Sequence, residues 1–254
     1  MSTNSMSARQ PWLAPHLWWW AALVAGVSYC LPAWSGWHGP LFIVWKGAGV
    51  GLLAVATALS PLAAHSHSSS TASTPGSLKQ RQHGLAFNDA RLLTAVMVCG
   101  ALGDVLLDAI SLVAGAAWFA LGHGLAMWLY WRNRRNEDTT SPRGALTRLW
   151  PFWLGVPVAL GVTAVLAKGQ PLAGVAIGYT LLVALMAAFA WRSRFSRWLT
   201  GLGAFLFVVS DLCIFARTAG PLELQALFGW LVWPLYFTGQ ALIVRGVLQG
   251  PPPD

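Results

Sequence analysis

Residues 96–111 read VMVCGALGDVLLDAIS, a stretch that is apolar enough to cross a lipid bilayer except for Asp104 and Asp108. An ionised carboxylate near the bilayer centre costs about 2.5–3.5 kcal/mol on the insertion scale, so such residues are kept for a structural or functional reason. Apolar blocks of this kind follow one another along nearly the whole chain, and each is close to the ~20 residues that a helix needs to cross the hydrocarbon core.

The composition indicates the same class of protein. Of 254 residues, 56% are hydrophobic and 9% are charged, which lies outside the range of soluble globular domains. The net charge of +8 does not indicate a nucleic acid partner, because the basic residues stand in short segments between apolar blocks. Cys30, Cys99 and Cys213 are separated by whole apolar blocks, a spacing that predicts neither disulfides nor a metal site.

We therefore expect an all-α membrane protein with eight transmembrane helices. The apolar blocks place them at residues 17–33, 40–61, 89–110, 113–131, 148–167, 171–191, 197–217 and 224–247. Tryptophans cluster near the predicted ends, as expected for rings at the level of the lipid headgroups. The first block is interpreted as an uncleaved span, because the chemistry of a signal-peptide cleavage site is unconvincing there.

The distribution of lysine and arginine predicts the orientation. Apart from Lys46, Lys168 and Arg217, all basic residues fall on one side of the predicted bundle. Because the cytoplasmic loops of membrane proteins are enriched in lysine and arginine, both termini are predicted to be cytoplasmic. The expected location is the bacterial inner membrane, as a multi-pass protein.

The predicted organisation is a single transmembrane domain with short tails. Residues 1–16 form a cytoplasmic tail, residues 17–248 the eight-helix domain with a flexible cytoplasmic linker at 62–88, and residues 249–254 a second tail. GDVLLD in the third block resembles SDLCIF in the seventh, and GHGLAM in the fourth resembles GQALIV in the eighth. This short echo favours two parallel four-helix halves.

Two aspartates are predicted to lie at the same depth in the membrane. Counted from the cytoplasmic ends of the third and seventh blocks, Asp104 and Asp211 each lie about 21–23 Å deep at 1.5 Å per residue. Lys46 and His123 come to a similar level. These residues therefore define a polar layer in the outer half of the bilayer.

Tyr179, Tyr236 and Gln240 are predicted to lie in this layer or slightly deeper. The pattern predicts a polar cavity within the bundle, built around two carboxyl groups. Such a cavity suits a proton-coupled transporter, a lipid-modifying hydrolase or a lipid-binding module. A purely structural or sensory membrane protein is a further alternative.

Each polar residue also has an ordinary structural interpretation, which the sequence leaves open. Intramembrane aspartates can hold a bundle together by pairing with lysine, histidine or tyrosine. Lys46 can extend its ammonium group to the membrane surface, and His123 can be a hydrogen-bonded core residue. Asp108 stands nearer the end of its block, where an interfacial carboxylate is solvated. Arg217 either caps the outer end of the seventh helix or binds a phosphate.

Five short motifs resemble those of the YhhN family of integral membrane proteins, whose characterised members are lysoplasmalogenases. They are WKG with Lys46, GD at Gly103 and Asp104, GAAWFALGH from Gly115 to His123, GAFLFVVSD from Gly203 to Asp211, and YFTGQALI from Tyr236 to Ile243. Three features depart from the family pattern, namely Gly47 in place of a proline, the acidic Asp108 and the long linker at 62–88.

The resemblance implies hydrolysis of the vinyl ether bond of a lysoplasmalogen. The products are a fatty aldehyde and glycerophospho-ethanolamine or glycerophospho-choline, and the catalytic residues implied are Asp104 and Asp211. A vinyl ether is stable to base and labile to acid, so one carboxyl group must donate a proton while the other stabilises a cation and activates water. No metal or cofactor is expected, and the expected partner is a membrane lysophospholipid with a vinyl ether chain.

We predict that Asp211 is the acid, because Phe207 and Phe215 share its helix face, and that Asp104, nearer Lys46, is the base. The reverse assignment stays open. The residues expected to bind the headgroup or to orient water are Lys46, His123, Tyr179, Tyr236 and Gln240. The competing hypothesis is a proton-coupled transporter or lipid carrier that uses the same aspartates as proton sites.

Overall fold

The computed structural model describes residues 15–68, 87–135 and 149–250. Apart from an isolated bridge between Arg134 and Ser193, the regular structure of these residues is helical. The helices are α1 (Pro15–Ser28), α2 (Cys30–Ser35), α3 (Pro40–Ser68), α4 (Phe87–Ala109), α5 (Leu112–Arg132), η3 (Pro151–Gly155), α7 (Val156–Leu166), α8 (Ala173–Arg192), η4 (Arg197–Gly201), α9 (Leu202–Ala219) and α10 (Leu222–Leu248).

Seven of the described helical segments are long and apolar enough to cross a membrane. Two of them are composite, because α1 continues into α2 over Pro15–Ser35 and η4 continues into α9 over Arg197–Ala219. The fifth predicted span, 148–167, is a shorter apolar helix at Pro151–Leu166. The multi-pass membrane protein is therefore confirmed, with seven of the eight predicted spans long enough to cross a membrane in the part of the chain that the structure describes. The orientation of the termini and the two-half arrangement stay predictions.

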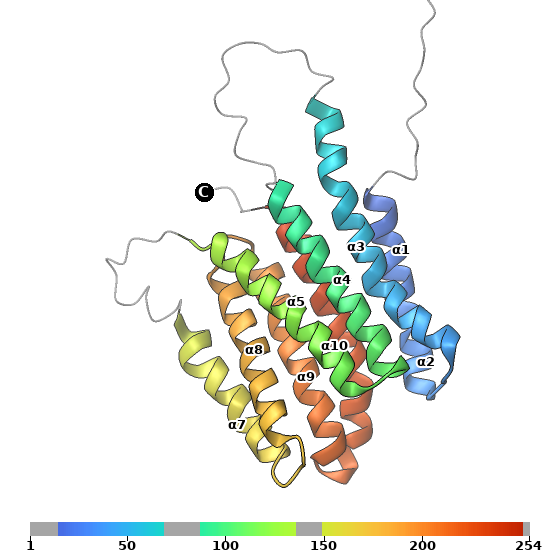
Figure 1. Cartoon of the computed structure of the whole chain (residues 1–254), viewed down its shortest axis with the longest axis vertical. Helices are drawn as coiled ribbons and strands as arrows, with labels where there is room; N and C mark the ends of the chain where they lie inside the picture. Colours follow the sequence, from blue (N-terminus) through green and yellow to red (C-terminus); the bar gives the residue numbers. More distant parts are fainter. Residues whose placement is uncertain (1–14, 69–86, 136–148, 251–254) are drawn as a thin grey trace, which may run out of the picture.

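Part of the predicted linker at 62–88 is helical, because α3 continues to Ser68 and α4 begins at Phe87. The rest of this linker and most of both predicted tails lie outside the described residues. In Figure 1 the helices run side by side as one bundle, with α4 between α3 and α5 and with α7 on the outer side of α8.

Close contacts at glycine residues set the distances between α9 and α10 and between α4 and α5. A Cβ atom placed on Gly203 of α9 would lie 2.6 Å from the carbonyl oxygen of Gly239 on α10, and the reverse also holds. On α5, a Cβ atom at Gly115 would lie 2.9 Å from the carbonyl oxygen of Gly103 on α4. Small residues allow such close approach of membrane helices, and α9 is therefore packed closely on α10, and α5 on α4.

At the end of the bundle where α5 and α8 terminate, Asp89 is 2% exposed. Its carboxyl oxygens lie 3.7 Å from Arg132 Nη2 and 3.8 Å from Arg194 Nη2. The Arg194 backbone N–H also donates to the carbonyl of Asn133 over 2.7 Å. The cluster therefore joins the start of α4 to the segments that follow α5 and α8.

We expect Asp89→Asn to lower the free energy of unfolding by about 1–3 kcal/mol, because two cations then lose a buried counter-charge. The half-exposed arginines keep the loss below that of a fully buried pair. Thermal unfolding in detergent measures the effect, and Glu223→Gln in the exposed first turn of α10 is the control. Equal melting temperatures for the two variants would show that the cluster does not stabilise the fold.

Candidate functional site

The residues predicted to form the site come from six helices that pack around one level of the bundle. They are Lys46 on α3, Asp104 on α4, His123 on α5, Tyr179 on α8, Asp211 on α9, and Tyr236 and Gln240 on α10. The two aspartates are almost fully buried, at 2% and 6% exposure. Asp104 stands near the end of α4 that leads into the turn to α5, whereas His123 and Tyr236 stand near the middle of α5 and α10.

Asp104 accepts a hydrogen bond from a tyrosine of another helix. The Tyr236 hydroxyl donates to Asp104 Oδ2 over 2.8 Å. One turn earlier on α4, a Cβ atom at Gly100 would lie 3.2 Å from Gln240 Nε2 and 3.6 Å from the Tyr236 hydroxyl. Glycine at position 100 thus allows Tyr236 and Gln240 to approach α4. Lys46 lies near enough for its positive charge to act on the Asp104 carboxyl.

Lys46 itself binds Asp108 and not Asp104. Its Nζ atom lies 2.9 Å from Asp108 Oδ2, and the two side chains are 15% and 33% exposed. Asp108 is exposed, as expected of an interfacial carboxylate, and it also has a partner, because Lys46 is paired with it within the protein. The signal in the sequence was the four-residue spacing from Asp104, which puts Asp108 on the same face of α4.

Asp211 has a different environment from Asp104. The Tyr179 hydroxyl interacts with its carboxyl group, whereas its Oδ2 atom is buried without a hydrogen-bond partner among the described residues. Tyr179 also lies 3.3 Å from His123 Nε2. Phe207, one turn before Asp211, is buried as expected from the shared face, whereas Phe215 is half-buried.

Within the described part of the chain, no hydrogen bond joins the carboxyl of Asp104 directly to that of Asp211. Each carboxyl stands beside a tyrosine, and Tyr236 and Tyr179 lie close enough to interact electrostatically. The two carboxyl groups are therefore connected through the two phenol groups and not by direct contact.

Aromatic rings fill the space where a polar cavity was expected. The Phe207 ring centroid lies 4.8 Å from that of His123 and 5.0 Å from that of Tyr236. Phe119 adds an edge-on contact to Tyr236 at 5.8 Å. The family motif GAAWFALGH contained Phe119, but its helix face alone did not indicate that its ring would cover the site.

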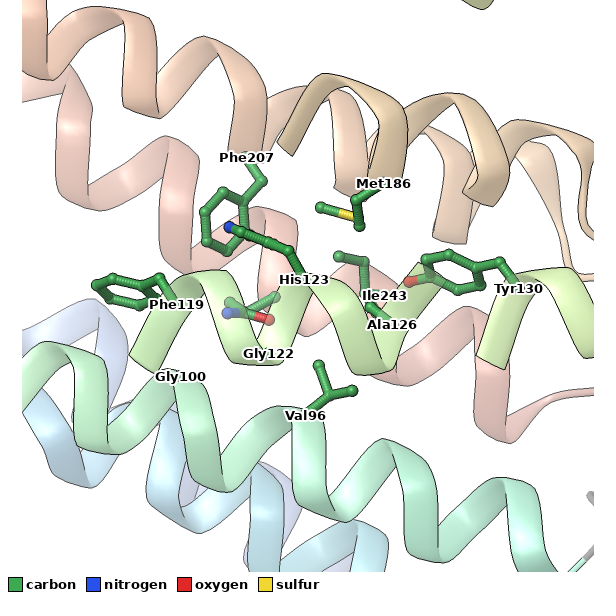
Figure 2. A pocket seen from close by; sticks show the side chains of 11 residues that line it. Val96, Gly100, Phe119, Gly122, His123, Ala126, Tyr130, Met186, Phe207 and Ile243 are labelled. Carbon is green, nitrogen blue, oxygen red and sulfur yellow. The ribbon is translucent and has the colours of Figure 1, made fainter. Parts of the chain in front are cut away.

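A small cavity of about 20 Å³ lies next to this aromatic cluster, large enough for about one water molecule. His123 and Gln240 line it together with apolar side chains, and neither aspartate does. Figure 2 shows the His123 and Phe207 side chains on one side of the cavity and Tyr130 at its other end. The cavity therefore adjoins the site and does not contain the two carboxyl groups.

Comparison with family models matches residues 41–247 to the YhhN family. The match includes every residue of the site described above, so the resemblance seen in the short motifs is confirmed. Comparison with curated proteins found no match, and comparison with solved structures found none either.

Proposed function

Because the chain belongs to the YhhN family, we propose that it is a lysoplasmalogenase, a hydrolase that cleaves the vinyl ether bond of lysoplasmalogens. The observation that carries the proposal is the pair of buried carboxyl groups of Asp104 and Asp211, each beside a tyrosine hydroxyl. Two such groups at membrane depth are costly to keep, and acid cleavage of a vinyl ether requires an acid and a base.

The reaction transfers one proton to carbon and adds one water molecule. An acid protonates the β-carbon of the vinyl ether, and the ether oxygen stabilises the resulting oxocarbenium ion. A base takes a proton from water as its oxygen attacks the cationic carbon. The hemiacetal then breaks its bond to the glycerol oxygen: its hydroxyl proton is lost as the carbonyl forms, and the glycerol oxygen takes up the proton that the base had removed from water. The products are a fatty aldehyde and a free glycerol hydroxyl. General acid and base groups each contribute about 10²–10⁴-fold to such steps.

Asp211 is proposed as the acid and Asp104 as the base. A negative charge on the buried, unpartnered Oδ2 atom of Asp211 would be poorly compensated, which favours a carboxylic acid at that position. The Asp104 carboxylate accepts a hydrogen bond from Tyr236 and lies in the field of Lys46. Tyr179 and Tyr236 stand between the two groups and can relay the proton that restores them after each turnover.

Lys46 and Asp108 are proposed to bind the two charges of a zwitterionic headgroup. They form the more exposed edge of the site, one turn of α4 beyond Asp104. A phosphate matches the ammonium group of Lys46, and the ammonium of ethanolamine or choline matches the carboxylate of Asp108. Bound substrate would thus replace the ion pair between Lys46 and Asp108 by two ion pairs, one from each residue to the headgroup. These contacts would hold the vinyl ether near the buried aspartates.

We expect Asp108→Asn to raise the KM for an ethanolamine lysoplasmalogen about tenfold, because one charged contact to the headgroup is lost. The kcat should change by less than threefold, since Asp108 takes no part in the bond changes. A substrate with a glycerol headgroup, which has no ammonium, should show no such rise and is the matched comparison. An equal rise in KM for both substrates would contradict a role for Asp108 in headgroup binding.

Aldehyde release by the purified protein in detergent micelles tests the proposed function. Micelles hold no gradient, so a proton-coupled transporter or lipid carrier gives no product there, whereas a hydrolase does. A panel of lysolipids with vinyl ether, alkyl ether and ester chains identifies the bond that is cleaved. The proposal fails if folded protein releases no aldehyde from vinyl ether substrates, and then uptake into sealed vesicles tests the transporter hypothesis.

A further inference from the structure

A second, much larger space lies between α1, α3 and α10, away from the site. Its volume is about 720 Å³, and its walls include Trp19 and Leu23 on α1 and Phe237 and Ala241 on α10. These α10 residues are the sequence neighbours of Tyr236 and Gln240 but line a different space. The groove is therefore separated from the proposed catalytic residues by the body of α10.

The groove exists because α1 and α10 touch at one end and separate toward the other. At the contact, a Cβ atom on Gly26 would lie 2.1 Å from the ring of Phe237, and the Trp233 indole donates to the Gly26 carbonyl over 2.7 Å. Just beyond α1, Trp34 of α2 donates to the Trp230 carbonyl of α10 over 3.0 Å. Toward Pro15 the groove lies between the two helices, where Pro15 and His16 on α1 and Arg245 and Leu248 on α10 line it.

The groove is mostly apolar, although Ser60 and Thr238 also line it, and it is basic at the end near Pro15. The walls at that end carry His16, in the first turn of α1, and Arg245, in the last turn of α10. Both residues are exposed. On α1 the lining extends from Pro15 to Val27, about 18 Å at 1.5 Å per residue. This length is close to one leaflet of the hydrocarbon core, about 15 Å.

The apolar walls and the basic end of the groove indicate which kind of molecule binds there. An apolar groove at membrane depth is filled by hydrocarbon, because water there would lack hydrogen-bond partners. A cation at the polar end of the groove favours an anionic headgroup, worth about 1 kcal/mol per Arg or Lys near a charged surface. We propose that the groove between α1 and α10 binds an anionic glycerophospholipid, with one acyl chain along Trp19, Leu23 and Phe237 and the phosphate at Arg245 and His16.

Bound lipid would stabilise the packing of α1 on the bundle, because α1 packs mainly on α3 and contacts α10 only near its C-terminal end. Binding to the folded state alone stabilises a protein by mass action. We therefore expect phosphatidylglycerol, added to the full-length protein in detergent, to raise the melting temperature by about 5 °C. Phosphatidylcholine should raise it distinctly less, because its headgroup carries no net negative charge.

Two variants test the two parts of the site, and neither touches the proposed catalytic residues. Arg245→Gln should remove the advantage of phosphatidylglycerol over phosphatidylcholine. Thr238→Trp, which places an indole in the groove from an exposed position on α10, should abolish stabilisation by both lipids. Arg217→Gln, an exposed arginine in the last turn of α9, is the control and should respond like the unaltered protein.

Equal stabilisation of the unaltered protein by the two lipids would overturn the proposal, as would an Arg245→Gln variant that still prefers phosphatidylglycerol. If neither lipid stabilises the full chain but both stabilise a chain without residues 1–14, that segment is the occupant and the lipid site is refuted. Size-exclusion chromatography confirms that Thr238→Trp is folded before its melting curve is interpreted.

Discussion

Replacing either Asp104 or Asp211 by asparagine is expected to lower kcat for vinyl ether hydrolysis by about 10²–10⁴-fold, the usual contribution of one general acid or base. Asparagine keeps the size of the side chain and part of its hydrogen bonding, but it neither donates a proton to carbon nor accepts one from water. Fatty aldehyde released by the purified variants in detergent, with a lysoplasmalogen as substrate, measures the loss directly.

The two variants should lose activity for different reasons. In Asp211→Asn the proton donor is absent, and a buried amide replaces a carboxyl that has one unpartnered oxygen. In Asp104→Asn the group that activates water is absent, although the Tyr236 hydroxyl keeps an acceptor in the amide oxygen. Because the two residues act in one reaction, the kcat of the double variant should be only slightly lower than that of the less active single variant.

Asp108→Asn is the matched control for both substitutions, since it removes an acidic residue from the same helix face without removing a proposed catalytic group. It should retain most of its kcat. If all three variants keep near-native turnover, the two-carboxyl mechanism is wrong. If the two catalytic variants also melt at a lower temperature than the unaltered protein, the aspartates serve the structure of the bundle instead.

The sequence predicts the bundle well because hydrocarbon leaves few alternatives to long apolar helices. Spans were recognisable wherever an apolar block exceeded the required length, as in Ala173–Arg192 and Leu222–Leu248. The fifth predicted span, 148–167, agrees closely with the helical residues 149–166, which include a π-helical turn at Pro151–Gly155 and end before Gly169, which has a φ of 78°. Helix α3 extends beyond its predicted span because an apolar block shows where a helix leaves the membrane and not where the helix ends, and residues 65–68 of α3 are polar.

The sequence predicted which residues lie at the level of the site, because the position of a residue along a membrane helix determines its depth in the bilayer. Counting 1.5 Å per residue brought Asp104, Asp211 and His123 to one level of the bundle, and the structure places them in one connected cluster. Depth does not specify which side chain faces which neighbour, and so the pairing of Lys46 with Asp108 was missed. That contact depends on the rotation of α3 against α4, which the packing of many apolar side chains determines.

The aromatic packing around the carboxyl groups was missed for the same reason. Phe119 and Phe207 were visible in the motifs, but ring contacts across α5, α9 and α10 depend on how closely these helices approach. Those distances are set by glycines, whose effect is seen only when the partner helix is known. The glycine contact between α9 and α10 is therefore the place where the fold and the proposed chemistry depend on each other most directly.

Gly203→Val is expected to reduce the free energy of unfolding by at least about 1–3 kcal/mol, the usual cost of overpacking, and to lower vinyl ether hydrolysis more than tenfold. A Cβ atom at position 203 would lie 2.6 Å from the Gly239 carbonyl oxygen and 3.0 Å from the Ile243 nitrogen. Both are backbone atoms, so the side chain is accommodated only if α9 and α10 move apart.

That movement separates the two helices that carry Asp211 and Tyr236, which explains why activity should fall together with stability. Gly229→Val is the matched control, because it places the same side chain on α10 at a position with no neighbouring atom within 4 Å. Melting temperature and aldehyde release should both stay near native in that variant. If Gly203→Val melts like Gly229→Val and retains its activity, the close approach of α9 and α10 does not hold the proposed site together.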